Sequence, residues 1–103
     1  MPIIITICWY PPGIAEQVAQ RYLELLQKSP VPDVVKRLVL PCSTSTPEGI
    51  EVVTVDEVKS KDMGAAWEYG DKFLIAFRDI EGFRWQKTVY NTITEGLKLI
   101  GMG

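Results

Sequence analysis

Two cysteines, Cys8 and Cys42, carry the most distinctive chemistry in this chain of 103 residues. They lie far apart in the sequence, there is no C-x-x-C spacing, and the chain contains no histidine. This pattern matches neither a disulfide framework nor the usual spacing of zinc ligands. We therefore interpret both as free thiols that pack as small apolar side chains, and we predict no metal site and no cofactor.

The acidic residues offer a second kind of chemistry. Asp56, Glu57, Glu48, Asp79 and Glu81 all fall near predicted turns. A general acid or base needs a pocket that shifts its pKa, whereas a carboxylate at a turn is normally solvated. We therefore predict no catalytic residue among them.

The three tryptophans form the candidate binding site. Trp9 ends the first apolar segment, Trp67 lies in a helical pattern and Trp85 lies in the last predicted strand. Together they could line one cleft between helices and sheet, and such a cleft would suit a small apolar or aromatic ligand. The simpler alternative is that all three fill the core, as aromatic residues commonly do.

Composition narrows the class of protein. Hydrophobic residues make up 47%, charged residues 23%, and the formal net charge is −2. The isoelectric point of about 5.1 and the scattered basic residues argue against nucleic acid as a partner. No basic n-region precedes the first apolar run, and no run is long enough to span a membrane. We expect one domain over residues 1–103, in the cytoplasm and not in a membrane.

Hydrophobic periodicity predicts the elements. We expect strands over 3–9, 34–44, 50–58 and 83–91, and helices over 14–28, 62–79 and 93–100. Pro30 ends the first helix because proline cannot continue it, and Asp62 is placed to cap the second. Thr92 and Glu95 have the spacing of a capping box before the third.

The order of these elements predicts the fold class. Strands and helices follow one another as β-α-β-β-α-β, with a short C-terminal helix added. This is the α+β, ferredoxin-like arrangement, in which the antiparallel sheet has the order 4-1-3-2. The turn at 46–49 makes the second and third strands a hairpin. Pro41 is then acceptable because its strand lies at an edge, where a missing N–H does no harm.

Side-chain alternation predicts one covered and one open face of the sheet. We expect Ile3, Ile5, Ile7 and Trp9 to lie under the helices. The open face would then hold a mainly apolar set of residues: Ile4, Thr6, Cys8, Tyr10, Val39, Val53, Val55 and Tyr90. Such a face is too apolar to stay in water, and it has the character of a protein interface. We predict a homodimer that stacks sheet on sheet through these residues.

Three segments resemble a known family. They are the hairpin with Thr46–Val52 and Val55–Lys59, the turn Ile80–Trp85, and the tail Ile93–Met102. On these segments, nearly the whole chain resembles the dimeric α+β barrel superfamily, and most of all small archaeal proteins of unknown function. The resemblance implies pairing of two ferredoxin-like sheets. Enzymes of the superfamily often use a histidine in the cleft, and its absence here disfavours the haem-dependent and histidine-dependent members.

Three functional hypotheses follow. The first is a non-catalytic module for small-ligand binding or assembly, with the three tryptophans at its cleft. The second is a cofactor-independent oxygenase or isomerase that uses the same cleft. The third is a purely structural or regulatory interaction module.

Overall fold

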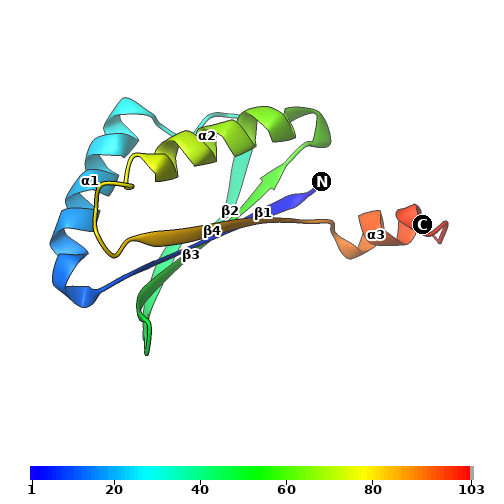
Figure 1. The fold of residues 1–103 in the computed structure, drawn as a ribbon. Coiled ribbons are helices and arrows are strands. Elements are labelled where there is room, and N and C mark those ends of the chain that lie inside the picture. The colour runs from blue at the N-terminus through cyan, green and yellow to red at the C-terminus, as the bar shows by residue number, and fades with distance from the viewer. Residues whose placement is uncertain (103) are drawn as a thin grey trace.

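The computed structural model describes residues 1–102 of the chain (Figure 1). The elements run β1 (Ile3–Tyr10), α1 (Ala15–Lys28), β2 (Val35–Thr46), β3 (Gly49–Val58), α2 (Met63–Ile75), β4 (Arg84–Tyr90) and α3 (Ile93–Leu99). Short 3-10 turns, Pro12–Ile14 and Ser60–Asp62, lead into α1 and α2.

The sheet confirms the predicted fold class. Its strand order is β2-β3-β1-β4, which is the predicted order, and every pair is antiparallel. The helices α1 and α2 lie over one face of the sheet, and α3 projects beyond the end of β4 (Figure 1). None of the helices within residues 1–102 lies on the opposite face (Figure 1).

The ends of the helices follow from local chemistry, with two differences from the sequence prediction. The capping box is confirmed: the Glu95 N–H donates to Thr92 Oγ1 at 3.2 Å, and the Thr92 N–H donates to Glu95 Oε1 at 2.8 Å. Asp62 makes no side-chain cap, because the chain enters α2 through a 3-10 turn. The helix α2 also ends at Ile75, since the following amides bond three residues back in successive turns.

The side-chain alternation of β1 is opposite to the prediction. Ile4 is only 5% exposed and packs with Val58 and with Ala66 of α2. The residues of β1 that face the helices are therefore Ile4, Thr6, Cys8 and Tyr10. Their predicted place on the open face is wrong, and that face instead carries Ile3, Ile5, Ile7 and Trp9.

The error has a physical cause. Residues 3–5 and Ile7 are isoleucines, so both faces of β1 are apolar and alternation alone cannot tell them apart. The neighbouring strands decide the question through their register. Ile5 lies opposite Val55, and Ile7 lies opposite Val53, so the predicted interface residues Val39, Val53, Val55 and Tyr90 do lie on the open face.

The edge strand β2 pairs irregularly with β3. The register shifts between Arg37 and Val39 and again between Val39 and Cys42. Pro41 lies within this irregular part of an edge strand, where its missing N–H is tolerated. Since β3 separates β1 from β2, Cys8 and Cys42 are free thiols, as predicted.

The core between helices and sheet consists of two separate clusters. One joins Ile4, Val58 and Ala66, and the other joins Val18, Phe77 and Ile80. Partly buried side chains, including Trp67 at the first cluster and Phe73 at the second, extend them. Among the described residues, every helix falls short of the length and apolar character of a membrane span.

Gly49 is predicted to be required by the β2–β3 hairpin. Its φ is +114°, and a methyl group there would lie 2.6 Å from the carbonyl oxygen of Tyr10. Gly49→Ala should lower the free energy of unfolding by more than about 1 kcal/mol, through both strain and the clash. Denaturant unfolding measures this change. Gly64→Ala in α2, where the added methyl group meets open space, is the control and should be neutral or stabilising. Equal effects of the two changes would contradict the hairpin geometry.

Candidate functional site

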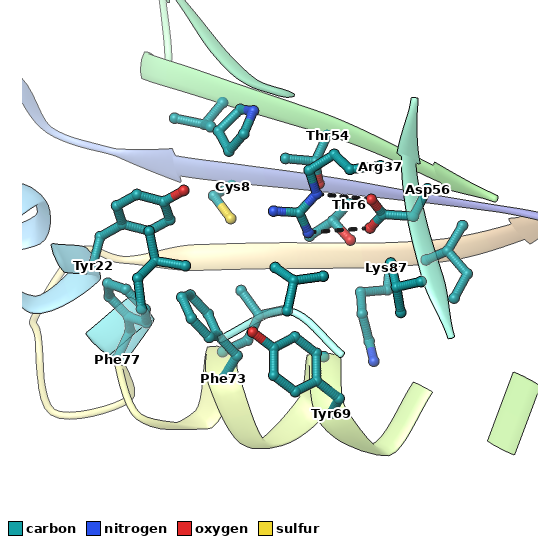
Figure 2. A pocket seen from close by; sticks show the side chains of 18 of the residues that line it. Thr6, Cys8, Tyr22, Arg37, Thr54, Asp56, Tyr69, Phe73, Phe77 and Lys87 are labelled. Atoms are coloured by element: carbon teal, nitrogen blue, oxygen red, sulfur yellow. Dashed lines mark hydrogen bonds and ion pairs between the residues drawn. The ribbon is translucent and has the colours of Figure 1, made fainter. Parts of the chain in front are cut away.

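A cavity of about 290 Å³ lies between the two helices and the covered face of the sheet. It is lined by Val18 and Phe77 of one core cluster and by Ile4 and Ala66 of the other. Figure 2 shows a close view of its lining, with the sheet on one side and the helices on the other. The two helices are therefore held apart from the middle of the sheet rather than packed down on it.

One wall of the cavity is aromatic. Phe77 stacks on Phe83 with ring centroids 4.6 Å apart, and Tyr10 stacks on Phe83 at 6.2 Å. Phe73 approaches Phe77 at 6.0 Å and meets Tyr22 edge to face at 5.9 Å. Such offset and edge contacts fix ring orientation. The wall is therefore an ordered apolar surface that a flat molecule could pack against.

The sheet contributes a polar row to the same cavity. Thr6 of β1 lies directly opposite Thr54 of β3 on one side and Lys87 of β4 on the other. All three line the cavity. Neither threonine hydroxyl makes a hydrogen bond to any residue in the range 1–102. A helix-covered sheet face is normally apolar, so this row stands out against its surroundings.

An ion pair lies beside this row. Arg37 Nε and Nη2 donate to the Asp56 carboxylate at 2.8 Å and 3.3 Å. Asp56 is only 7% exposed, and both residues line the cavity. The geometry is bidentate, which is the strong arrangement for arginine with a carboxylate. The pairing with Asp56 raises the pKa of Arg37 against the opposing effect of burial.

The ammonium group of Lys87 is held against α2. Its Nζ donates to the Trp67 carbonyl and to Asp71, both at 2.8 Å, and lies 3.8 Å from the Trp67 ring centroid. Gly70 makes room for it, because a Cβ there would lie 3.1 Å from Nζ. The lysine stem thus lines the cavity while its charge is compensated at the helix.

Cys8 lines the cavity as an uncharged group. Burial raises the pKa of its thiol to about 12, so it remains protonated at neutral pH. The Tyr22 hydroxyl points toward it (Figure 2). Cys42 also borders the cavity, but it lies on the edge strand and is exposed. Within residues 1–102, no three His, Cys, Asp or Glu side chains gather as a metal site.

The three tryptophans of the predicted cleft are not brought together. Trp9 lies on the open face, where its indole N–H donates to Glu51 at 2.9 Å and Arg84 lies over its ring at 5.7 Å. Trp85 and Trp67 lie on the helix side, and Trp67 packs against the first core cluster. The cavity wall is built from phenylalanine and tyrosine instead.

Sequence reasoning missed the residues that make the cavity polar: Thr6, Arg37, Thr54, Asp56 and Lys87. Asp56 was interpreted as a solvated turn residue, but it lies within β3 and is buried. One signal was present, because Thr54 and Asp56 alternate with Val53 and Val55. The prediction that Val53 and Val55 lie on the open face already leaves Thr54 and Asp56 on the covered face, which is where the structure has them.

The comparisons with known proteins identify the fold. No family model and no curated protein matches the chain. An uncharacterized NIPSNAP-like domain protein from Burkholderia xenovorans has a TM-score of 0.58 at 14% identity, covering 90% of this chain and 86% of its own. A protein from Deinococcus radiodurans named as a candidate antibiotic biosynthesis monooxygenase has a TM-score of 0.54 at 13% identity, covering 89% and 92%. The de novo designed protein Foldit4 has a TM-score of 0.51 at 11% identity, covering 88% and 96%.

These likenesses confirm the predicted fold and go no further. The NIPSNAP-like and monooxygenase-like structures share the ferredoxin-like α+β fold of this chain. The finer resemblance to small archaeal proteins finds no support among them. At identities of 11–14%, similarity of structure carries no activity across.

The two thiols are predicted to differ sharply in reactivity. Because the thiolate is the reactive species, buried and protonated Cys8 should react slowly with a thiol reagent at pH 8, while exposed Cys42 reacts at once. Labelling followed by mass spectrometry should give one fast addition in the native chain and none in Cys42→Ser. Fast labelling of Cys42→Ser without denaturant would contradict the burial of Cys8.

We predict that replacing both Arg37 and Asp56 by apolar residues is tolerated, whereas removing only one of them is not. Asp56→Ala should lower the free energy of unfolding by about 3 kcal/mol, because it leaves a guanidinium poorly solvated. The double variant Arg37→Met/Asp56→Leu should recover most of that loss, as apolar replacements of buried pairs often do. Chemical unfolding of both variants provides the measurement. A double variant as unstable as the single would show that the pair is needed for stability.

Proposed function

We propose that this protein is a non-catalytic binding module, and that it holds a small, flat, mainly apolar molecule in the cavity under its helices. The observation that carries the proposal is the polar row Thr6, Thr54 and Lys87, with the pair Arg37–Asp56 beside it, on a sheet face that a simple core would make apolar.

The energetics support this proposal. Burying a polar group without a hydrogen bond costs free energy, and burying a charge costs more. The hydroxyls of Thr6 and Thr54 have no protein partner among the described residues, and both are accessible to solvent through the cavity. A molecule that displaces this solvent needs a polar group of its own to replace the lost hydrogen bonds. An apolar body with a few convergent polar groups is the usual composition of a small-molecule site.

The cavity also fits such a molecule in size and shape. Its volume of about 290 Å³ is close to the lower end for small-molecule sites. The aromatic wall of Phe73, Phe77 and Phe83 offers faces and edges to a planar ring. We therefore expect a ligand of one or two fused rings rather than a large cofactor.

Filling the cavity is predicted to abolish binding. The neutral probe 2-naphthylmethanol should bind the native chain, as measured by calorimetry. Cys8→Phe, which adds a ring inside the cavity, should weaken that binding at least tenfold. Leu23→Phe adds the same ring on the exposed surface of α1 and should leave binding unchanged. Equal loss in both variants, or no binding to the native chain, would contradict the proposal and favour an interaction module.

We further propose a homodimer formed through the open face of the sheet. In the structure, the centre of this face consists of Ile5 and Ile7 of β1, which lie opposite Val55 and Val53 of β3. Glu51 and Arg84 flank Trp9 at one end and supply a polar rim. An apolar centre with a polar rim is typical of a protein interface. The correction makes this face more apolar than the sequence prediction did.

The C-terminal helix supports association as well. Ile93, Leu99, Ile100 and Met102 are each more than two-thirds exposed in the single chain. A helix of seven residues is not stable by itself in water, so its exposed apolar side chains are better explained by contact with a second copy.

A charge on the open face is predicted to break the dimer. The native chain should sediment as a dimer, and Ile7→Lys should sediment as a monomer, because two like charges would meet across the interface. Leu23→Lys on α1 tests an exposed apolar residue outside the sheet and should remain dimeric. A native monomer at micromolar concentration would contradict the sheet-face interface.

The alternative of a cofactor-independent oxygenase or isomerase needs a group that takes a proton from the substrate. Cys8 stays protonated at neutral pH, and the Asp56 carboxylate is engaged by Arg37. These contacts favour binding over catalysis. Turnover of a bound phenol with consumption of oxygen would support the oxygenase instead.

A further inference from the structure

We propose that the ligand of this cavity is an anion, namely a flat aromatic molecule with a carboxylate, whose oxygens lie between Arg37 and the hydroxyls of Thr6 and Thr54. This inference rests on the proposed binding function and adds the chemical class of the ligand. It follows from an excess of hydrogen-bond donors at one end of the cavity.

Arg37 has unused donors. Its Nε and Nη2 donate to Asp56, and no described residue accepts from Nη1. Figure 2 shows the third guanidinium nitrogen turned away from Asp56, toward the side of Cys8. Arginine presents five N–H donors and no acceptor. The free edge of the guanidinium is therefore solvent-accessible and available to an oxygen acceptor of a ligand.

Two hydroxyl donors lie beside it. Thr6 and Thr54 are opposite each other on adjacent strands, which places their side chains about 5 Å apart at the Cβ atoms. Thr54 lies two residues before Asp56 in the same strand, so both side chains point to the same face of the sheet. A hydroxyl can donate or accept, but an anion makes it donate. A carboxylate at this point would receive hydrogen bonds from Thr6, Thr54 and Arg37 together.

The two cations that line the cavity each have an acidic partner. Arg37 and Lys87 both line the cavity, whereas Asp56 is its only acidic lining residue within the described chain. Asp71, which pairs with Lys87, lies on the helix with its side chain 45% exposed to solvent. Each cation is thus compensated, and the preference for an anion comes from the donors that remain free at the cavity, namely Nη1 of Arg37 and the two threonine hydroxyls.

The aromatic wall positions the rest of the molecule. Phe73 and Phe77 line the cavity on the helix side, and the polar row lies on the sheet side. Phe73 packs between Tyr22 and Tyr69, with ring centroids 5.9 Å and 6.0 Å away, and Figure 2 shows these rings on the helix side of the cavity. A ring with one carboxylate can reach both surfaces at once. A purely apolar ligand would leave the donors unsatisfied.

The test compares three probes of one shape in isothermal calorimetry at pH 7: 2-naphthoate, 2-naphthylmethanol and 2-naphthylmethylammonium. We expect 2-naphthoate to bind about tenfold tighter than the alcohol or better, because hydrogen bonds to a charged group are the stronger ones. The ammonium compound should bind most weakly.

Variants locate the effect at the proposed polar end. Thr6→Val and Thr54→Val keep the side-chain shape and remove a hydroxyl, so each should weaken 2-naphthoate several-fold and weaken the alcohol less. Arg37→Met/Asp56→Leu should remove the preference for the anion. Thr44→Val is the matched control, because Thr44 pairs with Glu51 on the open face, and it should change neither affinity.

The outcomes separate the two proposals. Binding of the alcohol with equal or weaker binding of 2-naphthoate would overturn the anion inference and leave the binding function intact. The anion inference would also be overturned if all three cavity variants still bound 2-naphthoate more tightly than the alcohol. No binding of any probe would overturn the binding function together with the inference.

Discussion

The packing of the helices on the sheet depends on one constraint, the burial of the Arg37–Asp56 ion pair. Removing two charges from water costs several kcal/mol for each ion, and only close bidentate geometry offsets that cost. The pair lies on the covered face of the sheet, and it joins the irregular edge strand β2 to β3. If the helices packed directly on this face, the remaining N–H donors of Arg37 would be buried without a hydrogen-bond acceptor. The polar centre therefore favours a space between helices and sheet.

The split core is the structural consequence. Apolar clusters close the two ends of the helix–sheet layer, at Ile4 with Ala66 and at Val18 with Phe77. The cavity lies between them, with its aromatic wall on the helices and its polar row on the strands. On the other side of the same sheet, isoleucine and valine lie uncovered. One sheet thus has a polar patch where a core is expected and an apolar surface where water is expected, and both features indicate partners.

The sequence was sufficient for the fold but not for the site. Periodicity, the turn before Gly49 and the Thr92–Glu95 cap specify the elements and their order, because each is a local property. Which side chains of β1 face the helices is not a local property, since isoleucines occupy both of its faces. The Arg37–Asp56 pairing is still less accessible, because it depends on two register shifts in β2 that nothing in the sequence marks. The prediction of a tryptophan cleft failed for a related reason. An aromatic residue indicates that its position is buried, but not on which face of the sheet it lies.

The most direct test of the central claim is to find which face of the sheet responds to a ligand. Two-dimensional amide NMR of the labelled protein, titrated with 2-naphthoate, reports on both faces in one experiment. The account predicts the largest shifts at residues that line the cavity, such as Thr6, Thr54 and Phe73, with small shifts at Ile5 and Val55. Largest shifts at Ile5 and Val55 on the open face, with the cavity residues unmoved, would contradict it.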